Sequence, residues 1–346
     1  MDLSKIKQFT STGTRQADIN WKHRHLLDAW SWSTILSYNA GVKKFLKFQT
    51  ETGNQAFCLP ATSCDLSEFC LWAGRTSIKG TDAITAVTLT KYLFAIQAWH
   101  NFHGFTYPID SRAQLNLILK ACAKKDAEFK LKKEKTAIHL TQLKRLVDRL
   151  NLGDESDRAT ADLSLIAFWG MCRMKEVTYS NARGHLNKTE AILTSDVSFQ
   201  KNRTNNIAIL TLRGGKTAKP GELQRIKLAS QPSTLCPVMA VQRRLTDARG
   251  LDTSLFGYFS EGGRTHLTRE AVMNKIRSIS LEVDLSGITG HSFRVGGASL
   301  RNALGIPIRQ ICALGRWKSG AYKVYLKPYT EEEILEAVAL LKPHTL

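Results

Sequence analysis

At 346 residues and 43% hydrophobic content, the chain is long enough for two folded domains and too apolar to be disordered. Lysine and arginine outnumber aspartate and glutamate by 49 to 30, which gives a net charge of +19 and a pI near 9.7. Such an excess attracts polyanions and is typical of nucleic-acid-binding proteins, although ribosomal-type and membrane-surface basic proteins share it.

The seven cysteines include no Cys-x-x-Cys pair, which argues against a disulfide framework and predicts a reducing compartment. Cys58, Cys64 and Cys70 recur at six-residue steps, a spacing that zinc sites do not use, so no metal site is expected. The first residues, MDLSKIKQFTSTG, lack the apolar region of a signal peptide, and no run of 18 apolar residues follows. We therefore expect a soluble, intracellular protein with no membrane partner.

An all-helical N-terminal domain is expected over residues 21–123, after a flexible polar arm at 1–20. From Ser33 onward, apolar residues fall at steps of three and four, as on one face of a helix: Ile35, Tyr38, Val42 and Phe45. A second long helix is predicted from Thr88 to His103, with Gly104 as its stop. Shorter helices are expected at about 67–73 and 111–124.

A lysine-rich stretch follows this domain. Residues 120–135 read KACAKKDAEFKLKKEK, with seven lysines and three acidic residues, and we place a basic linker at 124–136. The stretch is open to three compatible interpretations: a solvated linker, a strap along a nucleic-acid backbone, or a nuclear-import signal in KLKKEK.

The second domain, residues 137–346, is predicted to be mostly helical with a small antiparallel sheet. Helices are expected at about 141–150, 163–169, 237–248 and 268–281, and again from Arg294 to the end. Between them, LTSDVSF, IAILTLR and QRIKLA are rich in alternating or β-branched residues and predict three strands. The fold class expected for the whole chain is therefore α+β.

The candidate catalytic residues cluster in one segment, HSFRVGGASLRNALGIPIRQICALGRWKSGAYKVY. Arg294 can clamp two non-bridging phosphate oxygens with its planar fork, and His291 can exchange a proton near neutral pH. Trp317 offers one indole N–H to a phosphate oxygen, and Tyr325 offers a nucleophilic oxygen. Because no GxxxxGK[ST] motif occurs, the phosphate is expected in DNA rather than in a nucleotide.

This spacing resembles the active-site half of the tyrosine recombinases, the phage-integrase family. His291-x-x-Arg294 resembles the family's second box, Gly315-Arg316-Trp317 its third, and Tyr325 stands eight residues after Trp317, where the nucleophile belongs. Gly170-Met-Cys-Arg-Met-Lys-Glu176 resembles the first box, in which an arginine and a glutamate share a helix face. The resemblance makes Arg173 the first phosphate clamp and Glu176 the residue that holds it.

Two assignments have competitors. The family carries a general-acid lysine at a β-hairpin, and LRGGKTAKPGELQRIKL places Lys216 there, with Lys219 as the alternative. Tyr322 and Tyr329 flank Tyr325, and only the offset from Trp317 selects Tyr325, so the other two are interpreted as packing residues.

The resemblance implies a C-shaped clamp on double-stranded DNA that needs no cofactor. Tyr325 would attack the scissile phosphate, the four residues around it would hold the charge, and Lys216 would protonate the leaving 5′-oxygen. A homodimer on one site and a tetramer in the synapse are implied as well. The DNA-binding candidates are Lys43, Lys44, Lys47, Lys91, Lys124, Lys125, Lys132 and Lys133.

Within the family, HSFRVGGAS and GRWKSGAYKVYL look most like the recombinases of eukaryotic mobile elements, the Crypton and DIRS-type groups, which implies a nuclear location. A prokaryotic source would instead place the protein in the cytoplasm or nucleoid. Two alternatives remain: a type IB topoisomerase, or a domesticated DNA-binding protein without activity. After Tyr325, Thr330 to Glu333 predict the start of a short helix that must dock on its own domain or on a neighbouring protomer.

Overall fold

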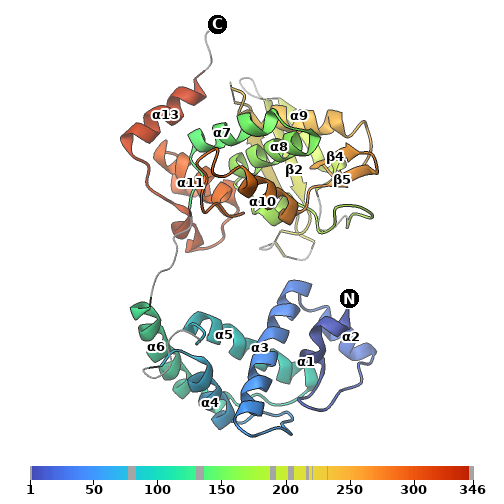
Figure 1. The fold of residues 1–346 in the computed structure, drawn as a ribbon, viewed down its shortest axis with the longest axis vertical. Helices are drawn as coiled ribbons and strands as arrows, with labels where there is room; N and C mark the ends of the chain where they lie inside the picture. The colour runs from blue at the N-terminus through green and yellow to red at the C-terminus, as the bar shows by residue number, and fades with distance from the viewer. Residues whose placement is uncertain are drawn as a thin grey trace. The chain divides into compact units, whose positions relative to one another are not determined.

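The structure is a computed structural model that describes residues 2–76, 83–129, 136–187, 192–201, 206–215, 218–219, 221–231 and 233–342, apart from the side chain of Ser111. The chain divides into two units, residues 1–132 and 133–346 (Figure 1). The division falls in the lysine-rich stretch. Lys132, Lys133 and the KLKKEK cluster lie outside the described residues.

The described part of the N-terminal unit is helical. α3 and α5 pack against each other at its centre, and α6 reaches Glu128, so the first residues expected in the linker belong to a helix. The helices are η1 (Leu3–Ile6), α1 (Lys7–Thr10), α2 (Trp21–Leu27), α3 (Trp32–Glu51), α4 (Ser63–Ala73), α5 (Ala86–His103), η2 (Ile109–Ser111) and α6 (Arg112–Glu128).

The flexible arm predicted at residues 1–20 is wrong for its first half, because that segment packs into the core of the unit. Ile6 and Phe9 are fully buried. The Phe9 N–H donates to Asn39 Oδ1 of α3 at 2.8 Å, and Trp99 Nε1 of α5 donates to the Ser11 carbonyl at 2.7 Å. Two apolar side chains are too few to show a periodic pattern. Their burial nevertheless anchors the segment, and hydrogen bonds to α3 and α5 satisfy backbone groups that would otherwise be buried without partners.

The C-terminal unit is organised around α8, whose residues 159–169 are all buried. α7, α9 and α11 pack against it. The helices of this unit are α7 (Leu140–Asn151), α8 (Glu155–Trp169), η3 (Met174–Glu176), η4 (Thr194–Asp196), α9 (Pro237–Asp247), α10 (Arg269–Ser278), α11 (Ser292–Ala303), α12 (Ile308–Gly315), η5 (Gly320–Tyr325) and α13 (Glu331–Leu341). In the part of the chain that is described, no helix is both long and apolar enough to cross a membrane.

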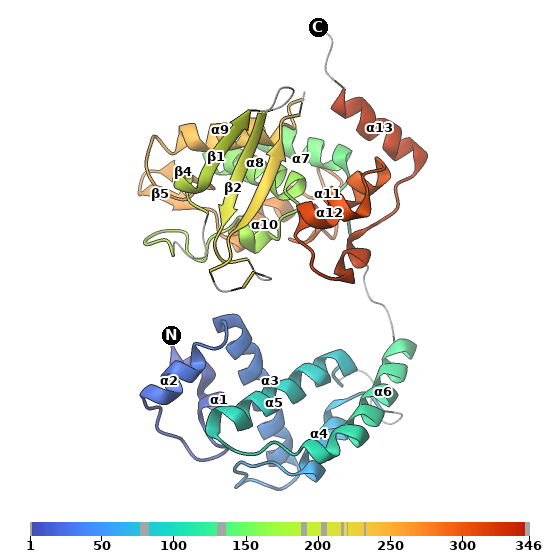
Figure 2. The ribbon, with the colours of Figure 1, turned by 180° about the vertical axis from the view of Figure 1, so that it is seen from behind.

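A three-stranded antiparallel sheet lies beside these helices, in the order β1 (Val197–Lys201), β2 (Asn206–Leu212) and β3 (Gln224–Ala229). Alternate residues of β3 are buried, and α9 packs on β2 and β3, so one face of the sheet covers the core (Figure 2). A small sheet within a largely helical chain confirms the predicted α+β class. A second hairpin, β4 (Gly257–Ser260) and β5 (Gly263–His266), was not predicted, because its strands are too short to show alternation.

The last helix, α13, packs on α7 of its own unit. Ala337 is buried there, and the Tyr329 ring stacks on His139 with centroids 4.5 Å apart. His139 Nδ1 also lies 3.0 Å from Glu333 Oε1, at the start of α13. Of the two docking modes left open by the sequence, this single chain adopts the one on its own domain.

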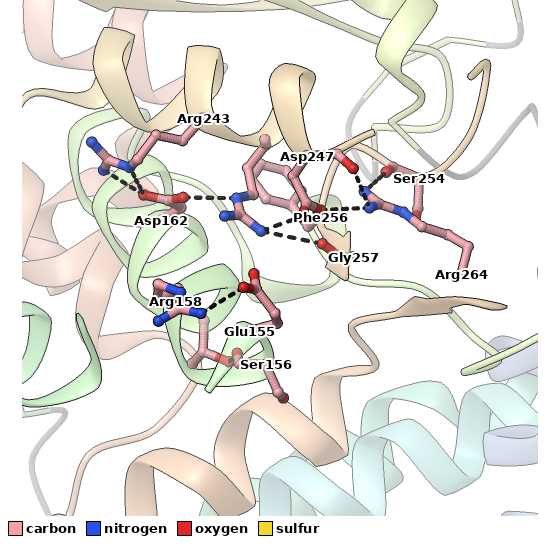
Figure 3. A network of polar contacts seen from close by, with 12 residues as sticks. Glu155, Ser156, Arg158, Asp162, Arg243, Asp247, Ser254, Phe256, Gly257 and Arg264 are labelled. Carbon is pink, nitrogen blue, oxygen red and sulfur yellow. Dashed lines mark hydrogen bonds and ion pairs between the residues drawn. The ribbon is translucent and has the colours of Figure 1, made fainter. Parts of the chain in front are cut away.

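A polar network joins α8, α9 and the β4–β5 hairpin (Figure 3). Asp162 of α8 is 1% exposed and accepts hydrogen bonds from Arg243 Nε at 3.0 Å and Arg244 Nε at 2.7 Å. At the other end, Arg264 of β5 pairs with Asp247 at 2.6 Å. Because Asp162 is the carboxylate shared by two arginines, the packing of α9 on α8 depends on it.

Replacing Asp162 by alanine is therefore expected to lower the free energy of unfolding by about 3 kcal/mol, since buried Arg244 would lose its shorter ion pair and keep only Asp247 at 3.6 Å and the Gly257 carbonyl at 3.3 Å. Chemical denaturation of the full chain measures this loss. Asp148→Ala removes an exposed carboxylate that pairs with Lys144 on α7, and should cost less than about 1 kcal/mol. Equal losses for the two variants would contradict the role given to Asp162.

Candidate active site

The site is built on the turn that follows α8. Met171 in this turn has φ of 44°, a left-handed conformation that costs a non-glycine residue about 1–2 kcal/mol. α11 approaches the end of α8 so closely that a Cβ on Gly297 would lie 2.1 Å from the Phe168 carbonyl oxygen. Glycine at this position therefore lets the side chains of α11 reach the turn.

Three successive carbonyls at the end of α8 are each bound by a different arginine. The last carbonyls of a helix have no partner within it and carry the negative end of its dipole, so cations are favoured there. The donors come from α11 and from the residue after α12: Arg301 to Trp169 at 2.7 Å, Arg316 to Gly170 at 3.2 Å, and Arg294 to Met171 at 2.5 Å. The end of α8 thus gathers positive charge from segments more than 100 residues away.

Glu176 lies between two of the arginines. Its Oε1 is 2.7 Å from Arg173 Nη1, and its Oε2 is 2.8 Å from Arg316 Nη2. Burial raises the pKa of Glu176, but the charge of Arg316 and the hydrogen bonds from Arg173 outweigh it, so the pKa is lowered overall. The two residues of the first box do not share an α-helix face as expected. Arg173 is extended and Glu176 closes the short helix η3, where its carboxylate also accepts the Arg173 N–H at 2.9 Å.

Arg294 is fully buried, and its fork faces the backbone rather than solvent. One terminal nitrogen donates to Met171, as described, and the other donates to the Gly315 carbonyl at 2.5 Å. Its Nε is buried with no hydrogen-bond partner among the described residues. The guanidinium lies 4.1 Å from the centre of the Trp317 ring and 5.6 Å from that of Tyr325. In this conformation the Arg294 side chain is therefore closed to solvent.

Burial, together with the nearby charge of Arg173, lowers the pKa of Arg294 to about 10, so the group remains cationic at neutral pH. By contrast, the Arg173 side chain is 18% exposed, which makes it the arginine of the pair that a ligand can contact directly.

The third box is held by a tight helix end. Arg316 has φ of 58°, its N–H donates to Ala313 and that of Trp317 donates to Cys312, a pattern in which glycine usually takes the left-handed position. The Trp317 ring folds back so closely that a Cβ on Gly315 would lie 1.8 Å from it. Arg316 was not among the predicted site residues. The sign that the sequence offers is an arginine directly after Gly315, where glycine is usual at a helix end.

Tyr325 ends η5 beside these rings. Its ring centroid is 5.3 Å from that of Trp317 and 6.2 Å from that of His291, which stands just before α11. The hydroxyl of buried Ser299 on α11 donates to the Tyr325 carbonyl at 3.1 Å and fixes the backbone. Tyr322 lies in the same short helix, whereas Tyr329 packs against His139.

Lys216 lies outside the described residues, so its position is not part of the site as described. Among the described residues nearby, Glu222, just before β3, pairs with Lys318, whose Nζ lies 3.2 Å from Glu222 Oε2. The competing Lys219 is exposed, and its N–H donates to Glu222 at 2.8 Å. The choice between the two lysines stays a prediction.

The DNA-binding candidates of the N-terminal unit lie on several helices. Lys43 and Lys47 of α3, with Lys7 of α1, line a hollow of about 440 Å³. Lys44 of the same helix lies 4.8 Å from the centre of the Trp72 ring. The others that are described are exposed Lys91 on α5, exposed Lys124 on α6, and Lys125, which pairs with Glu128.

No group of three or more His, Cys, Asp or Glu side chains suited to a metal ion occurs among the described residues. Cys58, Cys64 and Cys70 are free thiols that differ in exposure. Burial raises the pKa of Cys70 to about 12, which disfavours the thiolate that a metal would need.

Comparison with protein-family models found no match, and comparison with curated proteins found none. Solved structures are similar. The XerH site-specific recombinase bound to difH substrate, in a pre-cleavage complex, is 14% identical with a TM-score of 0.53 over 98% of this chain and 96% of that one. The Tn1549 transposon integrase in complex with circular intermediate DNA is 12% identical with a TM-score of 0.50 over 92% and 97%. The chain therefore has the fold of the tyrosine recombinases.

Proposed function

We propose that this protein is a site-specific DNA recombinase that cuts and rejoins strands through a 3′-phosphotyrosyl link at Tyr325. The observation that carries the proposal is the convergence of Arg173, His291, Arg294, Trp317 and Tyr325 around the end of α8. A phenol, a proton carrier and paired cations are the groups that attack on a phosphodiester needs.

In the proposed first step, the phenol oxygen of Tyr325 attacks phosphorus and the bond to the 5′-oxygen breaks. The phenol proton passes to His291, whose ring lies beside Tyr325. A proton from Lys216 reaches the departing oxygen, which leaves as a 5′-hydroxyl. Attack by a 5′-hydroxyl from a partner strand reverses the step, so the phosphodiester is restored without an outside energy source.

The arginines supply the electrostatic part of this reaction. Arg294 lies 5.6 Å from the centre of the Tyr325 ring, and Arg173 is near enough to Arg294 to lower its pKa. Arg316 offsets the charge of Glu176. Negative charge on the non-bridging oxygens grows in the transition state, so cations held in place beforehand stabilise it more than the ground state. Movement of Trp317 and Tyr325 away from Arg294 would accompany binding of the phosphate.

Double-stranded DNA is the proposed partner. The similar XerH structure is bound to its difH substrate and the Tn1549 integrase is in complex with circular intermediate DNA, and the net charge of +19 of this chain suits a polyanion. The hollow is lined by Lys7, Lys43 and Lys47, where a phosphate backbone would compete with Glu51, whose Oε1 lies 3.4 Å from Lys47 Nζ. DNA affinity should therefore fall steeply as salt concentration rises.

The finer parts of the proposal concern biology and assembly. We propose that the reaction mobilises a DNA element of the Crypton or DIRS type, in the nucleus, by a dimer on each site and a tetramer in the synapse. The motif residues from His291 to Tyr325 support this subgroup, because their spacing is the one that resembles it.

The test works without an identified target sequence. Duplexes are first enriched for binding from a random-sequence pool, then incubated with the protein in EDTA and quenched with SDS. We expect a covalent protein–DNA adduct and, with two labelled duplexes, products that join strands from both.

Each other outcome contradicts part of the proposal. Relaxation of supercoiled plasmid without joining of two duplexes would favour the topoisomerase alternative. Binding to the enriched duplexes without any adduct would leave a DNA-binding protein that does not cleave.

A further inference from the structure

We propose that Arg316 is a positioning residue for strand cleavage, which holds Glu176 and, through it, sets the position of Arg173. The inference rests on the proposed function. It concerns a side chain that belongs neither to the nucleophile nor to the groups placed around the phosphate.

The contacts of Arg316 join two segments of the site. Nη2 lies 2.8 Å from Glu176 Oε2, and Nη1 donates to the Gly170 carbonyl at 3.2 Å. Both Arg316 and Glu176 are almost fully buried, with side-chain exposures of 7% and 6%. A buried carboxylate held at both oxygens cannot rotate, so Arg173 on the opposite oxygen is fixed in turn.

The backbone of Arg316 shows that an arginine at this position has a conformational cost. Its left-handed conformation at the end of α12 suits glycine and strains an arginine. Strain of this kind persists where the surroundings compensate for it, and the ion pair with Glu176 is the compensation present here. A glycine would satisfy the backbone but would leave Glu176 without this partner.

Arg316 also changes the charge that Arg173 presents. The charged and titratable groups near Glu176 are Arg173, Arg294, Arg316 and the buried thiol of Cys172. Without Arg316, the carboxylate would be balanced by Arg173 alone, which would weaken the attraction of Arg173 for a phosphate. With Arg316 in place, the group of three arginines and one glutamate keeps a net charge of +2, which favours the extra negative charge of the transition state.

The contact further couples the first and third boxes. Trp317 follows Arg316 directly and covers Arg294, while Gly170 and Glu176 flank Arg173. Arg316 therefore helps to set the distance between these two segments, which Arg294 also joins by donating to both Met171 and Gly315. Small displacements in such a site have large effects on rate, because the reacting groups must be aligned.

Three variants test the proposal. Arg316→Gly removes the guanidinium and relieves the left-handed strain, so loss of function cannot come from the backbone. Arg316→Lys keeps the charge but has one nitrogen for the three acceptors of the guanidinium, which are Glu176, Gly170 and Leu314. Arg309→Ala removes an exposed positive charge from the same helix and serves as the matched control.

The first measurement is the rate of adduct formation at saturating DNA, set beside DNA affinity. For Arg316→Gly we expect the rate to fall about 100-fold while the Kd changes less than about threefold. Arg316→Lys should fall about tenfold, and Arg309→Ala should stay within about twofold of the unchanged chain.

The second measurement does not depend on activity. The ionisation of Glu176 is followed by NMR of ¹³C-labelled glutamate carboxylates, with Glu176→Gln to assign the signal. Arg316→Gly should raise the pKa of Glu176, since the strongest cation beside it is gone, and Arg309→Ala should leave it unchanged.

The proposal stands only if rate and Glu176 ionisation change together. A slower rate with unchanged Glu176 ionisation would overturn it, as would a raised pKa with an unchanged rate. If the unchanged chain forms no adduct, the proposed function fails on its own, and the NMR titration still decides whether Arg316 controls Glu176. Should Arg316→Gly not fold, the same two measurements on Arg316→Lys decide.

Discussion

Replacing Tyr325 by phenylalanine is expected to abolish the covalent protein–DNA adduct, with a fall in its rate of formation of at least about 10⁴-fold. The substitution removes the phenol oxygen and nothing else. The contacts of this side chain with Trp317 at 5.3 Å and with Arg294 at 5.6 Å are made by the ring, which phenylalanine keeps. The fold and the DNA affinity should therefore stay unchanged, and SDS-quenched reactions on enriched duplexes measure the loss.

Tyr322 provides the matched control, because it lies three residues earlier in the same short helix. Tyr322→Phe makes the same chemical change and should retain the adduct at nearly full rate. Tyr329→Phe should do so too, since Tyr329 packs against His139. Adduct formation that survives in Tyr325→Phe and disappears in one of the other two would move the nucleophile to that residue.

Arg294→Ala is expected to affect stability and activity together. The Met171 and Gly315 carbonyls would lose their donor, and a cavity would open beneath Trp317, which should cost about 3–5 kcal/mol in the free energy of unfolding. Loss of a preorganised cation should also lower the rate of adduct formation by about 10³-fold or more. Denaturation and adduct assays below the unfolding transition measure the two effects separately.

Arg301→Ala separates the catalytic effect of the Arg294 substitution from its effect on stability. Arg301 lies on the same helix, is half-buried, and donates to the Trp169 and Gly297 carbonyls, at 2.7 and 2.9 Å. Arg301→Ala should therefore lower the free energy of unfolding by an amount similar to that of Arg294→Ala, with a smaller loss in the rate of adduct formation. Equal rate losses in Arg294→Ala and Arg301→Ala would mean that Arg294 only supports the fold.

The sequence predicted the residues that carry spaced motifs. His291, Arg294, Trp317 and Tyr325 are close together in the chain, so their spacing can be recognised in the sequence alone. The long helices α3 and α5 followed from apolar periodicity, and the three strands of the larger sheet followed from β-branched and alternating residues. These features depend on neighbours in the chain, which a sequence displays directly.

What the sequence could not predict depends on contacts between distant segments. The burial of Arg294 results from carbonyls supplied by Met171 and Gly315 and from the ring of Trp317. The docking of residues 3–11 results from Asn39 and Trp99, which no pattern in the first residues reveals. The role of Arg316 depends on its left-handed backbone at the end of α12. The sequence shows there only an arginine at a position where folded helices usually have glycine.

The most direct test of strand cleavage by Tyr325 is to identify the amino acid that carries DNA. Adducts on enriched duplexes are trapped with SDS, digested with nuclease and protease, and analysed by mass spectrometry. We predict a single nucleotide-bearing peptide with the nucleotide joined through its 3′-phosphate to Tyr325. A nucleotide on Tyr322, Tyr329 or any other residue, or a link through a 5′-phosphate, would contradict the proposed chemistry.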